Sequence, residues 1–255
     1  MQKNETRYGC GGLTAVITGG TSGIGLAAAE KLLLDGAQVY ILSRYQPNGS
    51  EALRLLQAKT GRLAAYIPCD VTDAASCRAA LQLLSDGGFH IDLLVNAAGI
   101  YFEQRLESMT EYDYQRVMDV NVKGTLLMTQ AALPYMYSGG SIVNIASDAG
   151  VSGNYGCPLY CASKGAVVAL TRALALDLAP RIRVNCVCPA DVDTPLLERQ
   201  LAAGGYTLAE MAQGYPLERV GRAEEIAHVI CSLLSPANSF MTGSIVMADG
   251  GLTAK

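Results

Sequence analysis

The chain has 255 residues, of which 50% are hydrophobic and 16% are charged, and this composition excludes an intrinsically disordered protein. Its formal net charge is −4 and no run of Lys or Arg stands out, so we expect no nucleic-acid partner. Residues 1–12 lack the apolar core of a signal peptide, and no run of about 18 apolar residues follows, which predicts a cytoplasmic protein without a membrane span.

Strand-like and helix-like segments alternate along the chain. A polar segment, 1–12, is expected to be a flexible N-terminus; after it, short apolar runs predict strands and runs of helical composition predict helices. The expected strands are residues 13–20, 37–44, 63–70, 91–99, 141–147, 181–189 and 243–251. The expected helices are residues 23–36, 51–58, 74–84, 110–136, 160–178 and 223–234.

The order of these elements predicts the fold. The strands are almost fully apolar, as strands buried on both faces are, and their alternation with helices indicates parallel strands joined by right-handed crossovers. We therefore predict one α/β domain over residues 1–255, a doubly wound Rossmann-type fold whose parallel sheet of about seven strands carries helices on both faces. Residues 190–216 are the least regular part and exceed what a simple connection needs, so we predict a substrate loop there.

The turn between the first strand and the first helix reads TGGTSGIG, residues 18–25. A helix N-terminus offers unpaired N–H donors to phosphate, and glycine lets the backbone approach a pyrophosphate closely. No Gly-Lys-Ser/Thr follows, which excludes a Walker-type triphosphate loop. A plain tight turn is the alternative, but the flanking strand and helix favour a dinucleotide cofactor. The predicted contacts are Gly19, Thr21, Ser22, Gly23, Ile24 and Gly25.

The end of the second strand bears on the choice of cofactor. An NAD site usually has Asp or Glu there, to accept from the ribose 2′-OH, but this chain has Ser43 followed by Arg44. A guanidinium is well shaped to bind a 2′-phosphate. We therefore predict a preference for NADP(H), with an ordinary solvent-facing Arg44 as the alternative.

A tyrosine and a lysine in the helix 160–178 are candidates for acid/base chemistry. Tyr160 and Lys164 are four residues apart, which puts them on one face of the helix. Lowering the pKa of a phenol from about 10 to about 7 requires roughly 4 kcal/mol, and a nearby ammonium together with a positively charged nicotinamide is a source of it. Ser147 ends the preceding strand and is expected to hold the substrate oxygen. The alternative is that a Y-x-x-x-K pair, which is common by chance, simply lies on an ordinary helix surface.

Taken together, these motifs resemble the short-chain dehydrogenase/reductase family, in the branch of about this length, over nearly the whole chain. The resemblance implies that Asp70 and Val71 contact the adenine. It also implies that Asn96, Ala97 and Gly99 form the motif that shapes the sheet edge near the cofactor ribose. Asp70 could instead be a turn residue, and Asn96 could satisfy backbone groups at a strand end.

The same resemblance completes the catalytic set. Asn121 matches the helix Asn that supports a water relay behind the lysine, alongside Ser147, Tyr160 and Lys164. Asn121 could also bond backbone inside a helix, and Ser147 could simply end a strand. No metal site is expected, because the eight cysteines are scattered and the two histidines lie far from any Cys pair.

One position departs from the family pattern. Pro189 is followed by Ala190, where the family usually has Pro-Gly, and Ala would strain the turn if φ were positive there. Val192 and Thr194 keep the positions that, with Pro189, are implied to face the carboxamide and phosphates. Asp191 is an additional carboxylate, which we expect to touch a polar substrate. Further pocket-lining side chains are expected from the loops: Tyr101, Phe102, Tyr155, Leu196 and Tyr215.

The implied function is that of an oxidoreductase that interconverts a carbonyl and a secondary alcohol by hydride transfer, with Tyr160 as acid/base. The alternatives are an NAD(H)-dependent member (a sugar or polyol dehydrogenase, a hydroxysteroid dehydrogenase or a 3-oxoacyl reductase) and a non-catalytic nucleotide-sensing protein. The expected partner is a small-molecule substrate, and small residues in the helix 160–178 together with the resemblance imply a homo-oligomer, a dimer or tetramer.

Overall fold

The predicted strands form one parallel sheet in the computed structural model, which describes residues 7–205 and 207–254. The order is β3-β2-β1-β4-β5-β6-β9, and every neighbouring pair runs parallel. The prediction of a doubly wound α/β fold is therefore confirmed. The strands are β1 (Thr14–Thr18), β2 (Gln38–Ser43), β3 (Ala65–Pro68), β4 (Ile91–Asn96), β5 (Met136–Ile145), β6 (Ile182–Pro189) and β9 (Ile245–Ala248).

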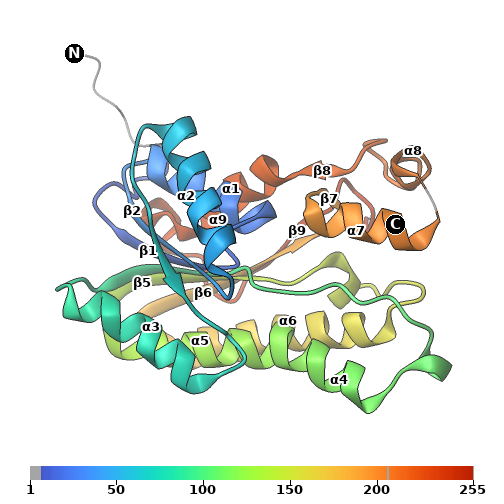
Figure 1. Ribbon diagram of the computed structural model, residues 1–255, viewed down its shortest axis with the longest axis horizontal. Helices are drawn as coiled ribbons and strands as arrows, with labels where there is room; N and C mark the ends of the chain where they lie inside the picture. The colour runs from blue at the N-terminus through green and yellow to red at the C-terminus, as the bar shows by residue number, and fades with distance from the viewer. Residues whose placement is uncertain (1–6, 206, 255) are drawn as a thin grey trace.

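Helices cover both faces of the sheet (Figure 1). One face carries α1 (Gly23–Leu34), α2 (Gln46–Thr60) and α9 (Ala223–Leu234). The other carries α3 (Ala74–Asp86), α4 (Glu111–Met118), α5 (Gly124–Ala132) and α6 (Pro158–Leu178). Successive residues of β1 point to opposite faces, so Ile17 joins the core against α1 and α9, whereas Val16 joins the core against α3 and α5.

The helix predicted over 110–136 is interrupted in the structure. After α4 comes a π-helical turn, η2 (Asp119–Lys123), then α5, and then a 3-10 turn, η3 (Leu133–Tyr135). The next strand, β5, begins at Met136 rather than at 141. A π turn keeps helical composition, so hydrophobic periodicity does not reveal it, and such turns occur frequently at functional positions.

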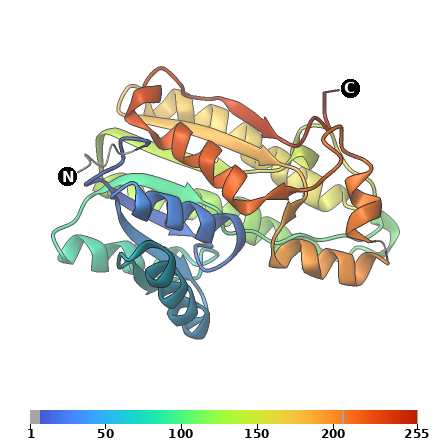
Figure 2. The same ribbon diagram turned by 90° about the horizontal axis from the view of Figure 1, so that it is seen from above.

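The segment 190–216, predicted as a substrate loop, contains short elements of its own. They are β7 (Val192–Asp193), α7 (Pro195–Gly204) and α8 (Leu208–Ala212), while residue 206 lies outside the described residues. Figure 2 shows α7 and α8 together at one end of the molecule, beyond the sheet. The remaining elements are β8 (Gly221–Arg222), η1 (Leu106–Ser108), η4 (Asp148–Gly150) and η5 (Pro236–Asn238).

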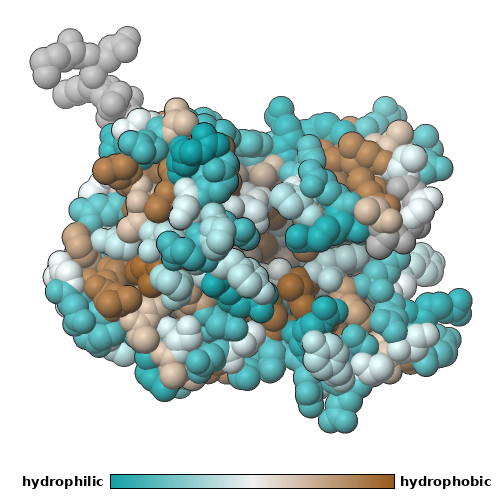
Figure 3. Space-filling view, viewed as in Figure 1, coloured by the Kyte–Doolittle hydropathy of each residue, from teal (hydrophilic) through white to brown (hydrophobic). Residues whose placement is uncertain are grey.

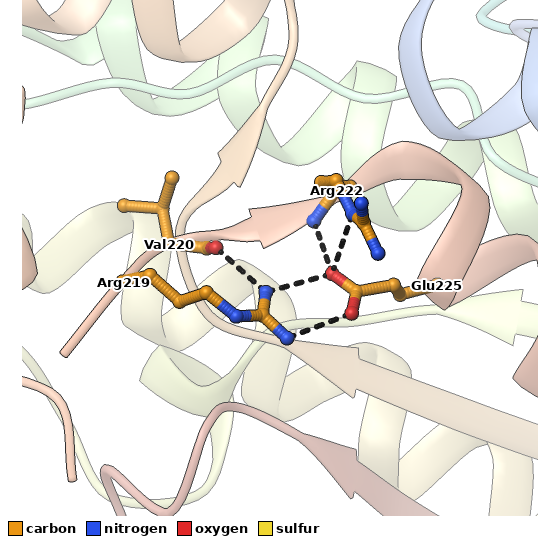
Figure 4. Close-up of polar contacts among 4 residues, drawn as sticks. All are labelled: Arg219, Val220, Arg222 and Glu225. Carbon is orange, nitrogen blue, oxygen red and sulfur yellow. Dashed lines mark hydrogen bonds and ion pairs between the residues drawn. The ribbon is translucent and has the colours of Figure 1, made fainter. Parts of the chain in front are cut away.

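An ion pair fixes the chain just after this segment (Figure 4). Arg219 binds both oxygens of Glu225 at 2.8 Å, and the backbone N–H of Arg222 donates to Glu225 at 2.9 Å. The Arg219 hydrogen bonds are the main reason that the pKa of Glu225 falls to about 2. Because β8 pairs with β7, the contact holds the chain beside Val192.

The segment 1–12, predicted to be flexible, is partly fixed to the fold. Residues 1–6 lie outside the described residues. The backbone N–H groups of Tyr8 and Cys10 donate to the Asp35 carboxylate at 2.9 and 2.7 Å, and Cys10 is buried. The prediction is therefore corrected for residues 8–10, because a carboxylate at the end of α1 binds their backbone.

Helix α6 and the molecular surface are relevant to the prediction that the chain has no membrane span. In the described residues, α6 alone is long and apolar enough to cross a bilayer, by length and composition only. It is also a core helix, because Val167 and Val168 pack against Cys186 and Cys188 of β6. Figure 3 shows hydrophobic residues on one face of the molecule in small groups separated by hydrophilic ones.

Candidate active site

A cleft lies at the carboxyl ends of the central strands. The sheet order reverses between β1 and β4, which are neighbours although their connections run in opposite directions. Open α/β sheets bind ligands at such a switch point. The cleft has a volume of about 420 Å³. The predicted residues among those lining it are Gly19, Ser22, Gly23, Ile24, Gly25, Ala97, Gly99, Ser147, Tyr160, Lys164, Pro189, Val192 and Thr194.

The first wall of the cleft is the glycine turn. Gly19 has φ +65, and a Cβ there would lie 2.8 Å from the carbonyl oxygen of Ala97. A Cβ on Gly25 would lie 2.4 Å from the carbonyl oxygen of Gly19. Both positions therefore require glycine, and the missing side chains leave a backbone-lined cradle. The Thr18 hydroxyl, which sequence reasoning did not assign, accepts from the N–H groups of Ala97 and Ala98 at 3.1 and 3.2 Å and joins the two loops.

Helix α1 starts in this cradle. Ser22 is its N-cap, but its side chain makes no capping hydrogen bond, so the first N–H groups of the helix stay available to a ligand. The N-terminus of a helix of this length also carries a positive partial charge. The cradle and the helix end together suit a pyrophosphate, which supports the predicted dinucleotide cofactor.

The predicted 2′-phosphate site lies at the end of β2. The Ser43 Oγ is buried and has no hydrogen-bond partner within the described part of the chain. Arg44 is exposed, and its guanidinium lies 5.5 Å from the centre of the Tyr45 ring. An orphaned hydroxyl beside an exposed guanidinium fits a polar ligand group, although neither residue lines the cleft itself.

Four other predicted cofactor contacts also lie outside the cleft lining: Thr21, Asp70, Val71 and Asn96. Asp70 accepts from the N–H and hydroxyl of Thr72 at 2.9 and 2.8 Å, which is a turn interaction. Asn96 is buried and donates to Thr129 and Asn144, so it joins β4 to its neighbours. Both partners are side chains, so these bonds are not the backbone bonds named as the alternative for Asn96.

The second wall begins with Ser147, at the start of η4. Its Oγ lies 2.7 Å from Asp148 Oδ1 and accepts from the N–H of Ala149 at 3.2 Å. The turn packs tightly on α6, because a Cβ on Gly150 would lie 2.5 Å from the Lys164 backbone. Gly150 thus lets the Ser147 turn reach the helix that carries Tyr160.

The Tyr160 phenol is buried beside Ser147 and makes an edge-on contact with Tyr101, with ring centres 5.0 Å apart. Burial raises the pKa of Tyr160 above its ordinary value, while a hydrogen bond with the Ser147 side chain acts in the opposite direction. In the cofactor-free chain burial is therefore the largest influence on the pKa of Tyr160, and the Lys164 ammonium lies close to the phenol, 5.7 Å from the centre of its ring.

Lys164 is buried one helical turn after Tyr160, as predicted. Its Nζ donates to the Ile145 carbonyl at 2.9 Å and lies 5.7 Å from the centre of the Tyr160 ring. Burial lowers the pKa of Lys164 to about 8. A Cβ on Gly99 would lie 3.4 Å from this Nζ, so Gly99 lies directly beside the ammonium.

Asn121 lies in the π-helical turn η2, behind Lys164. Its side chain donates to the Ile100 carbonyl and to Ser163 Oγ, both at 3.0 Å, and accepts from the Ile100 N–H at 2.8 Å. The side chain is thus occupied by the protein. Asn121 does not line the cleft, but a Cβ on Gly99 would be 3.4 Å from its Oδ1, so it stands directly behind the cleft wall.

The third wall follows β6. Among the described residues Glu218 is the one non-glycine residue with positive φ, so Ala190 is not strained in place of the usual glycine. The next residue, Asp191, accepts from the Tyr215 hydroxyl at 2.6 Å. Burial raises the pKa of Asp191, and the bond from Tyr215 opposes this. Asp191 lines the cleft, so the hypothesis that it touches a polar substrate stays open.

The cleft also contains residues that sequence reasoning missed. Asp148 and Glu103 add two carboxylates, and Arg199 adds an exposed cation from α7. Asp148 follows Ser147 directly, and this adjacency was the available signal. Tyr101, Tyr155 and Leu196 line the cleft as expected, whereas the expected Phe102 and Tyr215 are not in its lining.

Comparison with known proteins finds close relatives over nearly the full length. Residues 19–253 match the family model described as "Enoyl-(Acyl carrier protein) reductase". The chain is 36% identical to the 3-oxoacyl-acyl-carrier-protein reductase FabG of Thermotoga maritima, covering 94% of this chain and 98% of that protein. It is 38% identical to 2-(S)-hydroxypropyl-CoM dehydrogenase 3 of Xanthobacter autotrophicus, with coverage of 93% and 95%.

A solved structure matches equally well. A short-chain type dehydrogenase/reductase from Mycobacterium marinum superposes with a TM-score of 0.91 at 36% identity, covering 97% of this chain and 98% of that one.

Proposed function

Because this chain belongs to the short-chain dehydrogenase/reductase family of NAD(P)-dependent oxidoreductases, we propose that it interconverts a carbonyl and a secondary alcohol with Tyr160 as the acid/base. One observation carries the proposal. Tyr160, Lys164 and Ser147 meet in a single cleft whose other wall is the glycine cradle. Enoyl reductases of this family resemble Y-x-x-M-x-x-x-K, whereas Tyr160 and Lys164 are four residues apart, which favours carbonyl over enoyl chemistry.

The residues of the chain act on the substrate oxygen. In the reductive direction Ser147 and Tyr160 hydrogen-bond the carbonyl oxygen, and Tyr160 gives it a proton as the alcohol forms. The nicotinamide cofactor, when bound, supplies the hydride at its C4. Binding in the cleft orients the reacting groups.

Lys164 and Asn121 act behind the phenol. The Lys164 ammonium favours the phenolate that remains after proton transfer, and we expect it to bind the nicotinamide ribose. A water held near Asn121 returns a proton toward Tyr160 through Lys164. The bonds of Asn121 to Ile100 and Ser163 fix this end of the relay.

We propose NADP(H) as the preferred cofactor. The support is the orphaned Ser43 hydroxyl and the exposed Arg44 at the end of β2, where an acidic residue would favour NAD(H). An NAD(H)-dependent member remains the alternative, with a sugar, polyol, steroid or 3-oxoacyl substrate. The relatives named above are a 3-oxoacyl-acyl-carrier-protein reductase and a 2-(S)-hydroxypropyl-CoM dehydrogenase, so their names span both carbonyl reduction and alcohol oxidation.

The test is steady-state turnover of a carbonyl panel with NADPH and with NADH. We expect turnover with lower KM for NADPH, and loss of turnover in Tyr160→Phe with cofactor affinity retained. Tyr112→Phe, which removes an exposed hydroxyl on α4, is the matched control and should leave turnover unchanged. Cofactor binding without turnover on the whole panel would favour the nucleotide-sensing alternative, and turnover by Tyr160→Phe would remove Tyr160 from its role.

We also propose a homo-oligomer in the cytoplasm. The outer side of α6 exposes small residues, including Ala162, Ala169 and Ala173, which permit close helix packing. All eight cysteines are free thiols, as in a reducing compartment. Light scattering after gel filtration would give the mass of a dimer or tetramer, and the mass of a monomer would contradict the proposal.

A further inference from the structure

The Ser147 hydroxyl has one proton to donate, and two acceptors compete for it: Asp148 and the substrate oxygen. Ser147 Oγ lies 2.7 Å from Asp148 Oδ1, and both side chains are buried. Toward an ionised carboxylate, Ser147 must be the donor, because a carboxylate has no proton to give. The same hydroxyl is expected to hold the substrate oxygen, and it cannot donate to both.

The two possible substrates make opposite demands on Ser147. A carbonyl oxygen brings lone pairs and needs a donor, whereas an alcohol brings its own proton and can use an acceptor. A hydroxyl bonded to a carboxylate is held roughly twice as strongly as one bonded to a neutral group. An ionised Asp148 therefore competes directly with a carbonyl substrate for the Ser147 proton.

We propose that Asp148 is a positioning residue whose ionisation sets the direction of the Ser147 hydroxyl and so selects which substrate the site binds. With Asp148 ionised, Ser147 donates to it and presents a lone pair to an alcohol. With Asp148 neutral, the carboxyl group donates to Ser147, and the Ser147 proton turns to a carbonyl oxygen. The Asp148 proton is not consumed: reduction still takes its hydride from the reduced nicotinamide and its proton from Tyr160. This inference rests on the proposed function.

The surroundings make the neutral form of Asp148 accessible. Burial is the main cause that raises the pKa of Asp148, and Asp191 and Asp249 add to it, while bonds from Ser147 and Ala149 act in the opposite direction. Asp148 in turn raises the pKa of two phenols, Tyr160 and Tyr215, but these are neutral where a carboxyl group titrates, so the two carboxylates are the groups that oppose its negative charge. The carboxylates come from the ends of β6 and β9, and the phenols from α6 and the chain after α8.

The first experiment observes Asp148 without turnover. The protein is labelled with aspartate carrying ¹³C in the side-chain carboxyl, and the resonance missing from Asp148→Asn is followed against pH by NMR. We expect its midpoint above the ordinary value of about 4. In Ser147→Ala the midpoint should rise further, because the ionised form loses a donor. A midpoint at or below about 4, or no change in Ser147→Ala, would overturn the proposal.

The second experiment measures binding in complexes that cannot react. Calorimetry gives the affinity of the panel's best carbonyl substrate with oxidised cofactor, and of its alcohol with reduced cofactor, between pH 4.5 and 8. In the wild type we expect carbonyl affinity to fall about tenfold as Asp148 ionises, since one hydrogen bond is lost. Alcohol affinity should not fall. In Asp148→Asn, whose amide can donate to Ser147 at every pH, carbonyl affinity should stay level.

Asp177→Asn is the matched control, because it removes an exposed carboxylate of α6 outside the cleft and should retain the fall. If circular dichroism shows that Asp148→Asn is unfolded, Asp148→Ser replaces it, because serine is smaller and is also a neutral hydrogen-bond donor. The inference would be refuted if carbonyl affinity depended on pH equally in the wild type and in Asp148→Asn. It would also be refuted if carbonyl and alcohol affinity fell in parallel as pH rises. Failure of the proposed function would look different, since no carbonyl would be turned over by the wild type at all.

Discussion

Replacing Lys164 by Met should abolish turnover and yet stabilise the cofactor-free protein. The ammonium is buried, and burial lowers the pKa of Lys164 from 10.5 to about 8. At about 1.4 kcal/mol for each pKa unit, the folded state carries a penalty of about 3 kcal/mol at pH 7. Methionine removes the penalty but loses the bond to the Ile145 carbonyl, which costs about 1 kcal/mol. The net expectation is a gain of about 2 kcal/mol.

The pH dependence identifies the cause of this gain. The folded-state pKa lies below the unfolded-state pKa, so between pH 8 and 10.5 the unfolded chain binds more protons and the wild type gains stability as pH rises. At pH 9.5 roughly 1 kcal/mol of the penalty remains, and the advantage of Lys164→Met should fall to about zero.

Thermal unfolding of the cofactor-free protein at the two pH values is the assay. A gain of about 2 kcal/mol corresponds to a Tm increase of about 4–8 °C at pH 7 for a chain of this size. Lys123→Met is the matched control: that lysine is half exposed in a pair with Asp119, so its loss should change stability by less than about 1 kcal/mol at either pH. A Lys164→Met variant that is not more stable at pH 7, or is equally stabilised at both pH values, would refute the claim that burial of the Lys164 ammonium destabilises the folded state.

Three further substitutions test the site. Tyr160→Phe should reduce turnover by about 10²–10⁴-fold with little change in the Kd for NADPH, as measured by stopped-flow and fluorescence titration. Gly25→Ala should weaken NADPH binding by about tenfold or more, since its Cβ would lie 2.4 Å from the Gly19 carbonyl oxygen; unchanged affinity would show that the cradle is not the cofactor site. Arg44→Ala should raise the Kd for NADPH by about tenfold and leave that for NADH unchanged, whereas Arg54→Ala, an exposed arginine of α2, should alter neither.

Periodicity and spacing predicted the parts of this protein that depend on local pattern. Apolar runs located the strands, because a strand buried on both faces admits few polar residues. The spacing of Tyr160 and Lys164 predicted that both would point to one side of α6, and both line the cleft. The glycine turn was predictable since Gly19 and Gly25 occupy positions where a Cβ would meet backbone.

The features that the sequence did not reveal depend on tertiary contacts. The π-helical turn at Asn121 has ordinary helical composition, so the helix 110–136 seemed continuous. Asp148 gave no signal apart from its position after Ser147, because its effect depends on burial. The pKa of Tyr160 was expected to be lowered by Lys164, but burial of the phenol dominates in the structure.

The most direct test of the central claim is isotope transfer. NADPH carrying deuterium at nicotinamide C4 is incubated with the best carbonyl substrate, and the product alcohol is examined by mass spectrometry. With the wild type, hydride transfer predicts a product alcohol that carries one deuterium on the carbinol carbon. With Tyr160→Phe we expect almost no deuterated alcohol, because almost no product forms. The account would be contradicted if the alcohol carried no deuterium with either of two labelled cofactors, one labelled on each face of C4.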